Sequence, residues 1–533
     1  MIAPEHRRFW PHHLRWVLAS LGFLFFARCP VHADRASEDA AAAAFFSGPV
    51  LHWEITLPEE SLIALRRDAR TYVPGRLRVG GQDLPEVAFH LKGSAGSKRP
   101  VDDKPSWTVD INRFRPGRTL FGETKFHLNN SVQDSSYLNQ NLASRVYRAA
   151  GIPATRSTHG VLSINGRDVG VCVVVETYDL RYLRRAFPEE KSLPGNLYEG
   201  AFVGDIERNL ERDAGFGPND RSDLRRLREA TELPLGDRRA GLEQVLDVDE
   251  FLTLTAIQLM LDDWDGYVRN RNNYRIHFRR HDGRAVFLPS GIDQLLGHPE
   301  AQVRDAWRSR VATALLGIPG MQLRLRQRLQ ELSQSVLSES FLTNQMIQLQ
   351  SRIDAAVADR PAVEREVLFP DRYNQFSRVR NRLQNVAREL ATWPDPLPPW
   401  APGRRVTPTG WLAYVQFGAA DVATLTNAPI HLTAKATGTI ASVRTALTVP
   451  AGAYRISARA KTRGVVGLQD QFGTGAGVRL TGASRTQALI GDTDWTPVNY
   501  DFQATDDGPV EFILELRANA GEVWFDDIWV QVR

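Results

Sequence analysis

The chain is poor in cysteine, which limits the folds and sites that it can build. Its 533 residues include two cysteines, Cys29 and Cys172. Cys29 lies beside an apolar N-terminal segment, so removal of that segment leaves Cys172 alone and no intramolecular disulfide can form. Cys172 stands in the apolar run VGVCVVVE, where a small buried side chain is expected. The sequence contains no zinc-type cluster of cysteine and histidine.

The chain also lacks a strong charge of either sign. Lys and Arg number 66 against 62 Asp and Glu, which gives a formal net charge of +4. There is no basic block long enough to follow a nucleic-acid backbone, so we expect no nucleic-acid partner. A content of 42% apolar and 24% charged residues is typical of folded soluble protein, and 533 residues are enough for two or three domains.

The apolar run at the N-terminus is too short to span a bilayer comfortably, but it has the features of a sorting signal. Three arginines precede the run at residues 16–27, and the small-residue site Val31–Ala33 follows it. This order predicts a signal peptide at residues 1–33, and therefore a secreted or periplasmic protein with no transmembrane segment after cleavage. The signal carries four arginines and one glutamate, so its removal lowers the formal charge from +4 to about +1.

Two blocks of different composition follow the signal. Residues 48–392 alternate strand-like and helix-like segments, and an Asn165–Gly166 pair between two apolar runs predicts a tight hairpin. The proline-rich stretch at 393–405 predicts a semi-rigid linker. Residues 406–533 contain short alternating runs typical of a β-sandwich. The predicted fold class is α+β, followed by an all-β jelly-roll sandwich.

A polar loop in the first block is a candidate active site. Residues 262–278, DDWDGYVRNRNNYRIHF, follow an apolar helical run and contain three aspartates and three asparagines. Asp265 and Asn270 have the D-x-x-x-x-N spacing of protein-kinase catalytic loops, in which the aspartate acts on the acceptor hydroxyl and the asparagine helps to hold magnesium. Asp293 follows the apolar strand AVFLP, where a second metal ligand is expected. The alternative is that these residues only cap a turn.

An ordered series of motifs runs through the same block. Its members are HLKGSAGSKRP, LFGETKFHLNN, INGRDVGVCVVVETYDLRYL, GNLYEG, the loop above and FLPSGIDQLLG. Together they resemble the CotH kinase family, the spore coat protein H-like atypical kinases, over roughly residues 48–390. The resemblance implies an atypical protein-kinase-like domain at 48–392.

The resemblance assigns roles to residues of the loop and of the strand that follows it. Asp265 is implied to be the catalytic aspartate, and Asp293 the metal-binding one. The companion amide ligand is Asn270 by kinase spacing, or Asn273 by the family's Asn-Tyr pair. The family often places two acids where this chain has Ser290 to Asp293, so a second metal is in question.

The resemblance also implies cofactor-binding residues nearer the N-terminus. Lys104 is implied to contact phosphate, and Lys92 and Lys98 are nearby alternatives. Glu176, in VVVETYD, matches a family glutamate that is a candidate ion-pair partner for that lysine.

The activity that the resemblance implies is phosphotransfer. The γ-phosphoryl group of ATP, bound with Mg²⁺ or Mn²⁺, passes to serine or threonine hydroxyls of a surface or envelope protein. The alternative is a non-catalytic surface or adhesion protein that uses a degenerate kinase fold. The missing second acid and the scarcity of ATP outside the cytoplasm favour this alternative.

The second block resembles the jelly-roll modules attached to carbohydrate-active enzymes and surface proteins, on GDTDWTPVNYDFQA and VEFILELRANAGEVWFDDIWVQ. This resemblance implies a polysaccharide as a further partner. Asp526–Asp527 lie at an expected bend, where an aspartate helps to bind a structural calcium in many such sandwiches; a plain turn is the alternative. Trp495, Trp524 and Trp529 are expected in the core; the alternative is that exposed tryptophans stack on sugar rings.

Overall fold

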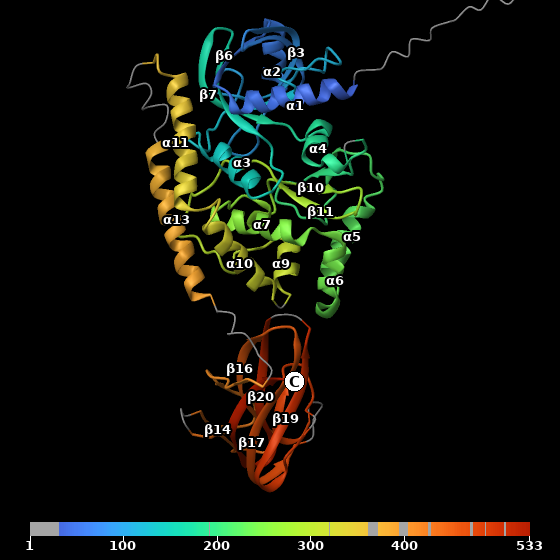
Figure 1. The fold of residues 1–533 in the computed structure, drawn as a ribbon, viewed down its shortest axis with the longest axis vertical. Helices are drawn as coiled ribbons and strands as arrows, with labels where there is room; N and C mark the ends of the chain where they lie inside the picture. Colours follow the sequence, from blue (N-terminus) through green and yellow to red (C-terminus); the bar gives the residue numbers. More distant parts are fainter. Residues whose placement is uncertain are drawn as a thin grey trace, which may run out of the picture.

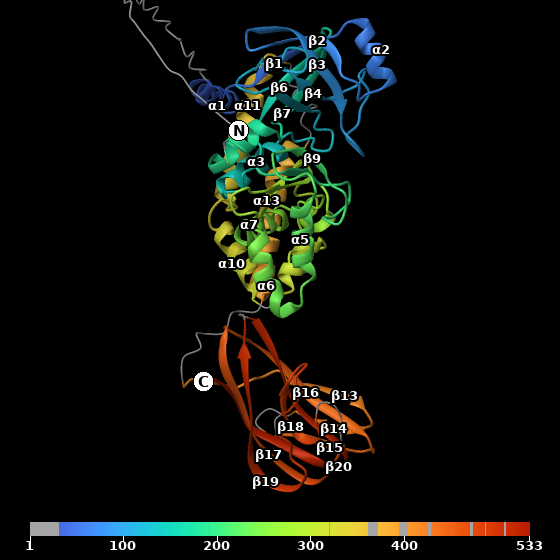
Figure 2. The ribbon, with the colours of Figure 1, turned by 90° about the vertical axis from the view of Figure 1, so that its right-hand side faces the viewer.

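The computed structural model of the chain describes most of the sequence after the predicted signal. The described residues are 31–190, 192–318, 320–360, 371–393, 403–424, 428–468, 473–485, 487–505 and 508–533. Most of the predicted signal peptide and of the proline-rich linker therefore lies outside the described residues. Figures 1 and 2 show a β-barrel at one end, a largely helical lobe next to it and an all-β module beyond the end of α13.

Seven strands close into a barrel in the order β1-β2-β3-β4-β5-β7-β6. Their bounds are β1 (Leu51–Thr56), β2 (Val73–Val79), β3 (Gln82–Lys92), β4 (Ser106–Asp110), β5 (Lys125–Asn129), β6 (Ser157–Ile164) and β7 (Arg167–Glu176). The parallel pair β1–β6 closes the ring, so the barrel has no free edge. Trp53, Trp107 and Phe126 fill its interior. Asn165 and Gly166 both have positive φ, which confirms the predicted tight hairpin between β6 and β7.

A helix that the sequence did not predict packs against this barrel. This helix, α1 (Val31–Ser47), begins at the expected signal-cleavage site. Its Phe45 is buried among the barrel residues and stacks on Phe121 with ring centroids 4.6 Å apart. A Cβ on Gly122 would lie 2.0 Å from the carbonyl oxygen of Glu38, so only glycine permits this approach. A second helix, α2 (Glu59–Arg67), connects β1 to β2.

The second lobe combines helices with a four-stranded sheet of order β11-β10-β8-β9. Its strands are β8 (Leu197–Glu199), β9 (Glu211–Ala214), β10 (Tyr274–Phe278) and β11 (Ala285–Pro289). Its helices are α3 (Asn139–Ala149), α4 (Leu180–Ala186), η1 (Pro188–Glu190), α5 (Ser222–Glu232), α6 (Leu235–Val245), α7 (Val248–Met260), α8 (Tyr267–Asn270), α9 (Arg310–Leu316), α10 (Met321–Ser333), α11 (Glu339–Ala356) and α13 (Arg372–Thr392). Asp247 caps α7 by accepting a hydrogen bond from the backbone amide of Glu250 at 3.2 Å. None of the described helices is long and apolar enough to cross a membrane.

The C-terminal module is built from strands alone, which confirms the predicted α+β class with an all-β sandwich at its end. The strands are β12 (Arg405–Val406), β13 (Leu412–Phe417), β14 (Ala420–Ala423), β15 (Ile430–Ala434), β16 (Thr439–Val449), β17 (Gly452–Gly467), β18 (Gly475–Leu480), β19 (Gly491–Ala504) and β20 (Gly508–Val532). The first half of β20 pairs with β16 and β18, and its second half pairs with β15 and β17. This long strand therefore belongs to both layers of the sandwich, and Leu432, Ile456 and Phe512 lie in the core between them.

Asp526 and Asp527, where a calcium was expected, lie exposed at an irregularity in β20. Asp527 has a φ of 44°, in the left-handed region, which fits a bulge. Among the described residues no three Asp, Glu, His or Cys side chains are placed so that they could hold a metal ion. Calcium at this bend stays a prediction.

We expect limited proteolysis to cut the chain between Trp393 and Arg405. The stretch holds five prolines, which donate no backbone hydrogen bonds, and each flanking region buries a core of its own. Gel electrophoresis with mass spectrometry of the digest should therefore show two protected fragments. Cleavage scattered through residues 406–533 at the same protease dose would contradict an independently folded module.

Candidate active site

The polar loop predicted from the sequence connects α7 to β10 through the single turn of α8. Gln258 near the end of α7 holds it from both sides: its carbonyl oxygen accepts from the amide of Asp263 at 2.9 Å, and its Oε1 accepts from the amide of Val268 at 2.9 Å. Arg271 and Asn273 have φ values of 54° and 49°, so the backbone is held in a conformation that side chains disfavour. A fixed loop of this kind positions its carboxylates and amides.

Three asparagine amides surround Asp265. The Nδ2 atoms of Asn270 and Asn272 donate to Oδ1 of Asp265 at 2.6 Å and 3.1 Å, and Nδ2 of Asn273 donates to its Oδ2 at 2.8 Å. The carboxylate is nearly buried, with 9% of the residue exposed. Because each asparagine uses its amide nitrogen here, its side-chain oxygen remains available as a ligand. The loop therefore brings Asp265, Asn270 and Asn273 together, while the catalytic and metal-binding roles assigned to them from the sequence stay predictions.

Asp293 follows β11 and lies within electrostatic range of Asp265. Burial raises the pKa of the Asp293 carboxyl to about 6; its own backbone amide and Lys92 oppose the rise, and Asp265 adds to it. The helical lobe fixes the main chain at this point, because Nδ2 of Asn139, the first residue of α3, donates to the Asp293 carbonyl oxygen at 2.9 Å. Asp293 thus faces both the loop and the barrel.

The lysine whose charge acts on Asp293 is Lys92, the last residue of β3. Its Nζ donates to Oδ1 of Asn129 on β5 at 2.8 Å. Burial lowers the pKa of Lys92 to about 8, and the charge of Asp293 partly offsets this effect. The barrel therefore contributes one ammonium group to the region of the two aspartates.

Lys104, the predicted phosphate ligand, lies elsewhere. Its Nζ donates to the hydroxyl of Tyr137 and lies 4.6 Å from the centroid of that ring. Burial lowers its pKa, and the titratable groups that act on it are Cys172, Asp103 and Asp168 rather than the loop aspartates. The structure therefore gives the position near Asp293 to Lys92 at the end of β3, whereas Lys104, which precedes the neighbouring strand β4, contacts Tyr137.

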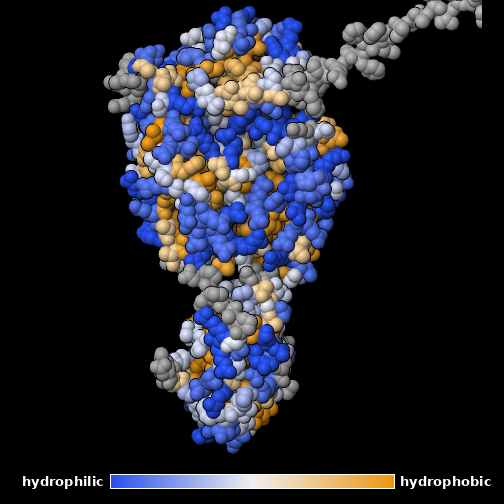
Figure 3. All heavy atoms as spheres, in the orientation of Figure 1, coloured by the Kyte–Doolittle hydropathy of each residue, from blue (hydrophilic) through white to orange (hydrophobic). Residues whose placement is uncertain are grey.

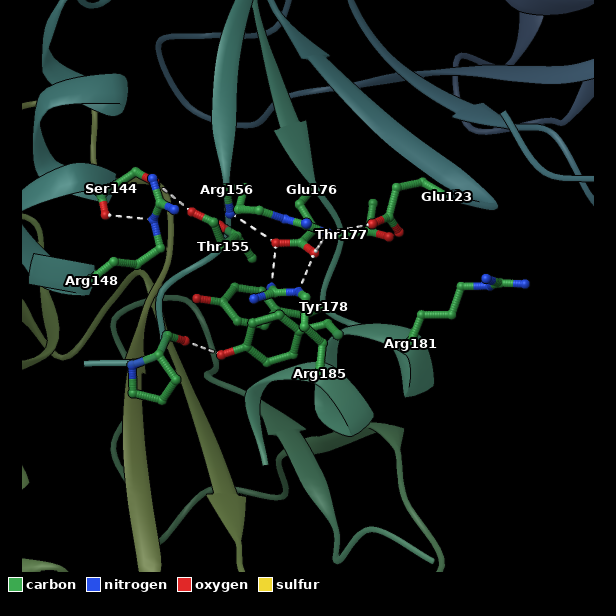
Figure 4. Close-up of polar contacts among 12 residues, drawn as sticks. Glu123, Ser144, Arg148, Thr155, Arg156, Glu176, Thr177, Tyr178, Arg181 and Arg185 are labelled. Carbon is green, nitrogen blue, oxygen red and sulfur yellow. Dashed lines mark hydrogen bonds and ion pairs between the residues drawn. The ribbon is translucent and has the colours of Figure 1, made fainter. Parts of the chain in front are cut away.

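Glu176, the predicted partner of that lysine, is bound by two arginines (Figure 4). Its carboxylate accepts from the backbone amide of Arg156 at 2.8 Å and from Nη2 of Arg156 at 2.7 Å. Arg185 on α4 donates to it from Nε at 3.0 Å and from Nη2 at 2.6 Å. Burial opposes its ionisation, but the two guanidiniums hold the pKa of Glu176 below its ordinary value. Arg156 also donates to Glu123 at 2.7 Å, and burial together with the Glu176 charge raises the pKa of Glu123.

Sequence reasoning did not find the contributions of Asn129, Asn139 and Asn272. Asn272 lies inside the loop already singled out, so its position was a usable signal. Asn129 and Asn139 belong to a strand and a helix far from the loop in sequence. Only the folded lobes bring them near Lys92 and Asp293.

The donor set fits a magnesium ion that is bound together with nucleotide phosphates. The candidate ligands are the carboxylate of Asp293 and the amide oxygens of Asn270 and Asn273; Asp265 is held beside these amides, and Lys92 lies within electrostatic range of Asp293. Mg²⁺ usually takes one or two carboxylates and completes its shell with water and substrate phosphates. The described residues contain no group of three acidic, His or Cys side chains able to cage a metal, and such a shared site does not need one.

A model of the CotH kinase protein family matches residues 89–393, more than half of the chain. The chain belongs to this family. Among curated proteins it is similar to inner spore coat protein H of Bacillus subtilis (strain 168), with 19% identity over 345 residues that cover 60% of this chain and 91% of the relative.

Two solved structures each match about a quarter of the chain. One is TmCBM61 in complex with β-1,4-galactotriose, with 10% identity over 23% of this chain and 88% of the other, and a TM-score of 0.17. Another is the CBM22-1 xylan-binding domain from Paenibacillus barcinonensis Xyn10C, with 14% identity over 23% and 85% of the two chains and a TM-score of 0.16. Scores this low carry no argument about fold or ligand.

The contacts of Glu176 predict that its replacement by glutamine lowers the stability of the protein considerably. Glu176→Gln removes the buried carboxylate that Arg156 and Arg185 share, so Arg185 loses its carboxylate and Arg156 keeps only Glu123; we expect the free energy of unfolding to fall by about 3 kcal/mol in urea titrations at pH 7. The folded-state pKa lies below the ordinary 4.5, so the stabilisation is present above pH 4.5 and is lost as the pH falls through the folded value. The difference between wild type and variant should shrink accordingly in acid.

The matched control for this variant is Glu232→Gln. Glu232 pairs with Arg310 at 3.3 Å on the surface, where its side chain is 53% exposed, so its loss should change the free energy of unfolding by less than about 1 kcal/mol. Equal effects of the two substitutions would show that the Glu176 cluster contributes no more than a surface pair.

Proposed function

We propose that the chain is a secreted atypical protein kinase. It transfers the γ-phosphoryl group of ATP, bound with Mg²⁺ or Mn²⁺, to serine or threonine hydroxyls of a surface or envelope protein. The supporting observation is the approach of Lys92 from the barrel to Asp293 of the second lobe, which itself lies within electrostatic range of Asp265. Membership of the CotH kinase protein family and the D-x-x-x-x-N spacing agree with it.

Each side chain in the proposed site has a task that its surroundings favour. The three amides orient Asp265, so its carboxylate can accept the proton of an acceptor hydroxyl. Asp293 and the side-chain oxygens of Asn270 and Asn273 hold the metal ion, which neutralises phosphate charge when it is bound. With a pKa of about 8, Lys92 is mostly protonated at pH 7 and can donate to a phosphate oxygen.

The alternative, a non-catalytic surface or adhesion protein, is less consistent with where the acids lie. A loop that serves only as a turn does not need buried carboxyl groups. Burial raises the pKa of Asp263 far above its ordinary value, and the Asp265 charge adds to the effect. Such placement costs folding free energy, and groups perturbed in this way cluster at functional sites.

Substitutions at the two aspartates should remove different steps of the reaction. Asp293→Ala should lose both metal-dependent ATP binding and transfer, because a principal ligand of the metal is gone. Asp265→Asn should keep ATP binding but lower the transfer rate by roughly 10²–10⁴-fold, since an amide cannot accept the hydroxyl proton. Transfer is measured with γ-labelled ATP, to the protein itself and to casein, after circular dichroism has confirmed folding.

A pair of lysine variants serves as the matched control. Lys92→Met should weaken ATP binding and transfer, whereas Lys104→Met should leave both near wild type because Lys104 contacts Tyr137 instead. Wild-type transfer that persists in both aspartate variants would exclude the proposed roles. A strong effect of Lys104→Met alone would move the phosphate site to that lysine.

A further inference from the structure

The outer face of one layer of the C-terminal module carries a regular array of polar side chains. Along β17 the side chains of Tyr454, Ile456, Ala458 and Ala460 are buried. The alternate positions form the opposite face and hold Arg455, Ser457, Arg459, Lys461 and Arg463. At about 3.3 Å per residue, the eight steps from the first to the last span about 26 Å. Figure 3 shows hydrophilic side chains in a band over the module, in the area where Figure 1 labels β17 and β20.

Three tryptophans flank this strand on the same face, although the sequence placed them in the core. Each is half-buried and carries an arginine over its ring. The distances from guanidinium carbon to ring centroid are 5.4 Å for Arg459 and Trp495, 5.7 Å for Arg463 and Trp524, and 4.1 Å for Arg405 and Trp529. Trp495 lies on β19 and the other two on β20, so aromatic rings stand on both sides of β17.

Trp524 differs from the other two because a histidine covers one side of its ring. His431 on β15 stacks on it with centroids 4.5 Å apart and an interplanar angle of 4°, and Nε2 of His431 lies 2.9 Å from Oε2 of Glu522. This stack fixes Trp524 as part of the frame. Trp495 and Trp529 are therefore the stronger candidates for contact with a ligand.

Three of the cations on this face are paired with carboxylates, and the other two, Arg405 and Arg459, lie over tryptophan rings. Arg455 contacts Asp501 at 2.6 Å, Lys461 contacts Asp494 at 3.6 Å, and Arg463 contacts Glu522 at 3.6 Å. A partner that is bound by its charge, such as a nucleic acid or a strongly acidic polymer, requires a field of one sign. Paired carboxylates and guanidiniums instead offer donors and acceptors side by side, which suits the hydroxyl groups of a sugar.

We propose that this face, formed by β15, β20, β17 and β19, binds a neutral polysaccharide. The rings of Trp495 and Trp529 stack on the C–H faces of two separated sugar residues, and the Arg455–Asp501 and Arg463–Glu522 pairs hydrogen-bond to hydroxyls between and beside them. An elongated open face suits a chain of sugars better than a small molecule, which needs a concave pocket. The jelly-roll resemblance implied a polysaccharide partner, and the proposal adds the face and the residues that bind it. It does not depend on phosphotransfer.

Affinity electrophoresis of the full exported protein tests the proposal. Native gels contain xylan, mixed-linkage β-glucan, galactan or glucomannan, and at least one of them should retard the wild type. The double variant Trp495→Ala/Trp529→Ala should bind that polymer roughly tenfold or more weakly. The control is Tyr414→Ala, because Tyr414 on β13 is also exposed and also lies under an arginine, with Arg444 at 4.4 Å, but belongs to the other layer. It should bind as the wild type does.

Three outcomes would overturn the proposal. In the first, none of the neutral polymers retards the wild type. In the second, the tryptophan double variant is still retarded as strongly as the wild type. In the third, the wild type binds polygalacturonate in a salt-sensitive way and does not bind the neutral polymers. Thermal melting of each variant confirms that the module is folded. Asp265→Asn, which should keep polysaccharide binding, separates this proposal from the kinase proposal, so either one can fail alone.

Discussion

The buried carboxylate of Glu176 connects the barrel to the second lobe, and the arrangement of the candidate site depends on this connection. Glu176 is the last residue of β7 in the barrel. Arg185, which binds it, belongs to α4 in the second lobe. A second contact supports the first: Glu38 on α1 pairs with Arg181 on α4 at 2.5 Å, while Phe45 and Phe46 anchor α1 in the barrel. Buried ion pairs of this kind contribute more to a defined geometry than to net stability.

That geometry places Lys92 within electrostatic range of Asp293. The lysine ends a barrel strand, and the aspartate follows a strand of the other lobe, so their separation depends on how the lobes are joined. Each of the two groups has a shifted pKa because burial disfavours its charge, and each lessens the shift of the other. A metal ion and phosphate groups between the lobes would supply the charges that these residues are placed to meet.

Local patterns predicted the parts of the structure that neighbouring residues determine. The Asn165–Gly166 turn, the strand before Asp293 and the polar loop that holds Asp265 all follow from short stretches of sequence. Contacts between distant segments could not be read in this way. Whether Lys92 or Lys104 lies near Asp293 depends on how the barrel meets the second lobe. The two arginines that bind Glu176 come from segments that only the fold brings together.

The tryptophans of the C-terminal module show the same limit. Trp524 and Trp529 are five residues apart, so strict alternation would place them on opposite faces of β20. The register shift near Asp527 inserts an extra residue, and both rings then lie on the outer face. If that face binds a polysaccharide, the covalent connection between the module and the two lobes keeps the lobes near the same polymer and raises their local concentration at its surface.

The most direct test of the central claim is a thermal titration of the protein with ATP, in the presence and absence of Mg²⁺ or Mn²⁺. Binding to the folded state stabilises it by about 2.7 kcal/mol when the ligand is at 100 times its dissociation constant. If Lys92 and Asp293 hold a metal–nucleotide complex, the melting temperature rises with ATP only when the metal is present, and Lys92→Met lowers the response. An unchanged melting temperature, or an equal rise without metal, would contradict the account.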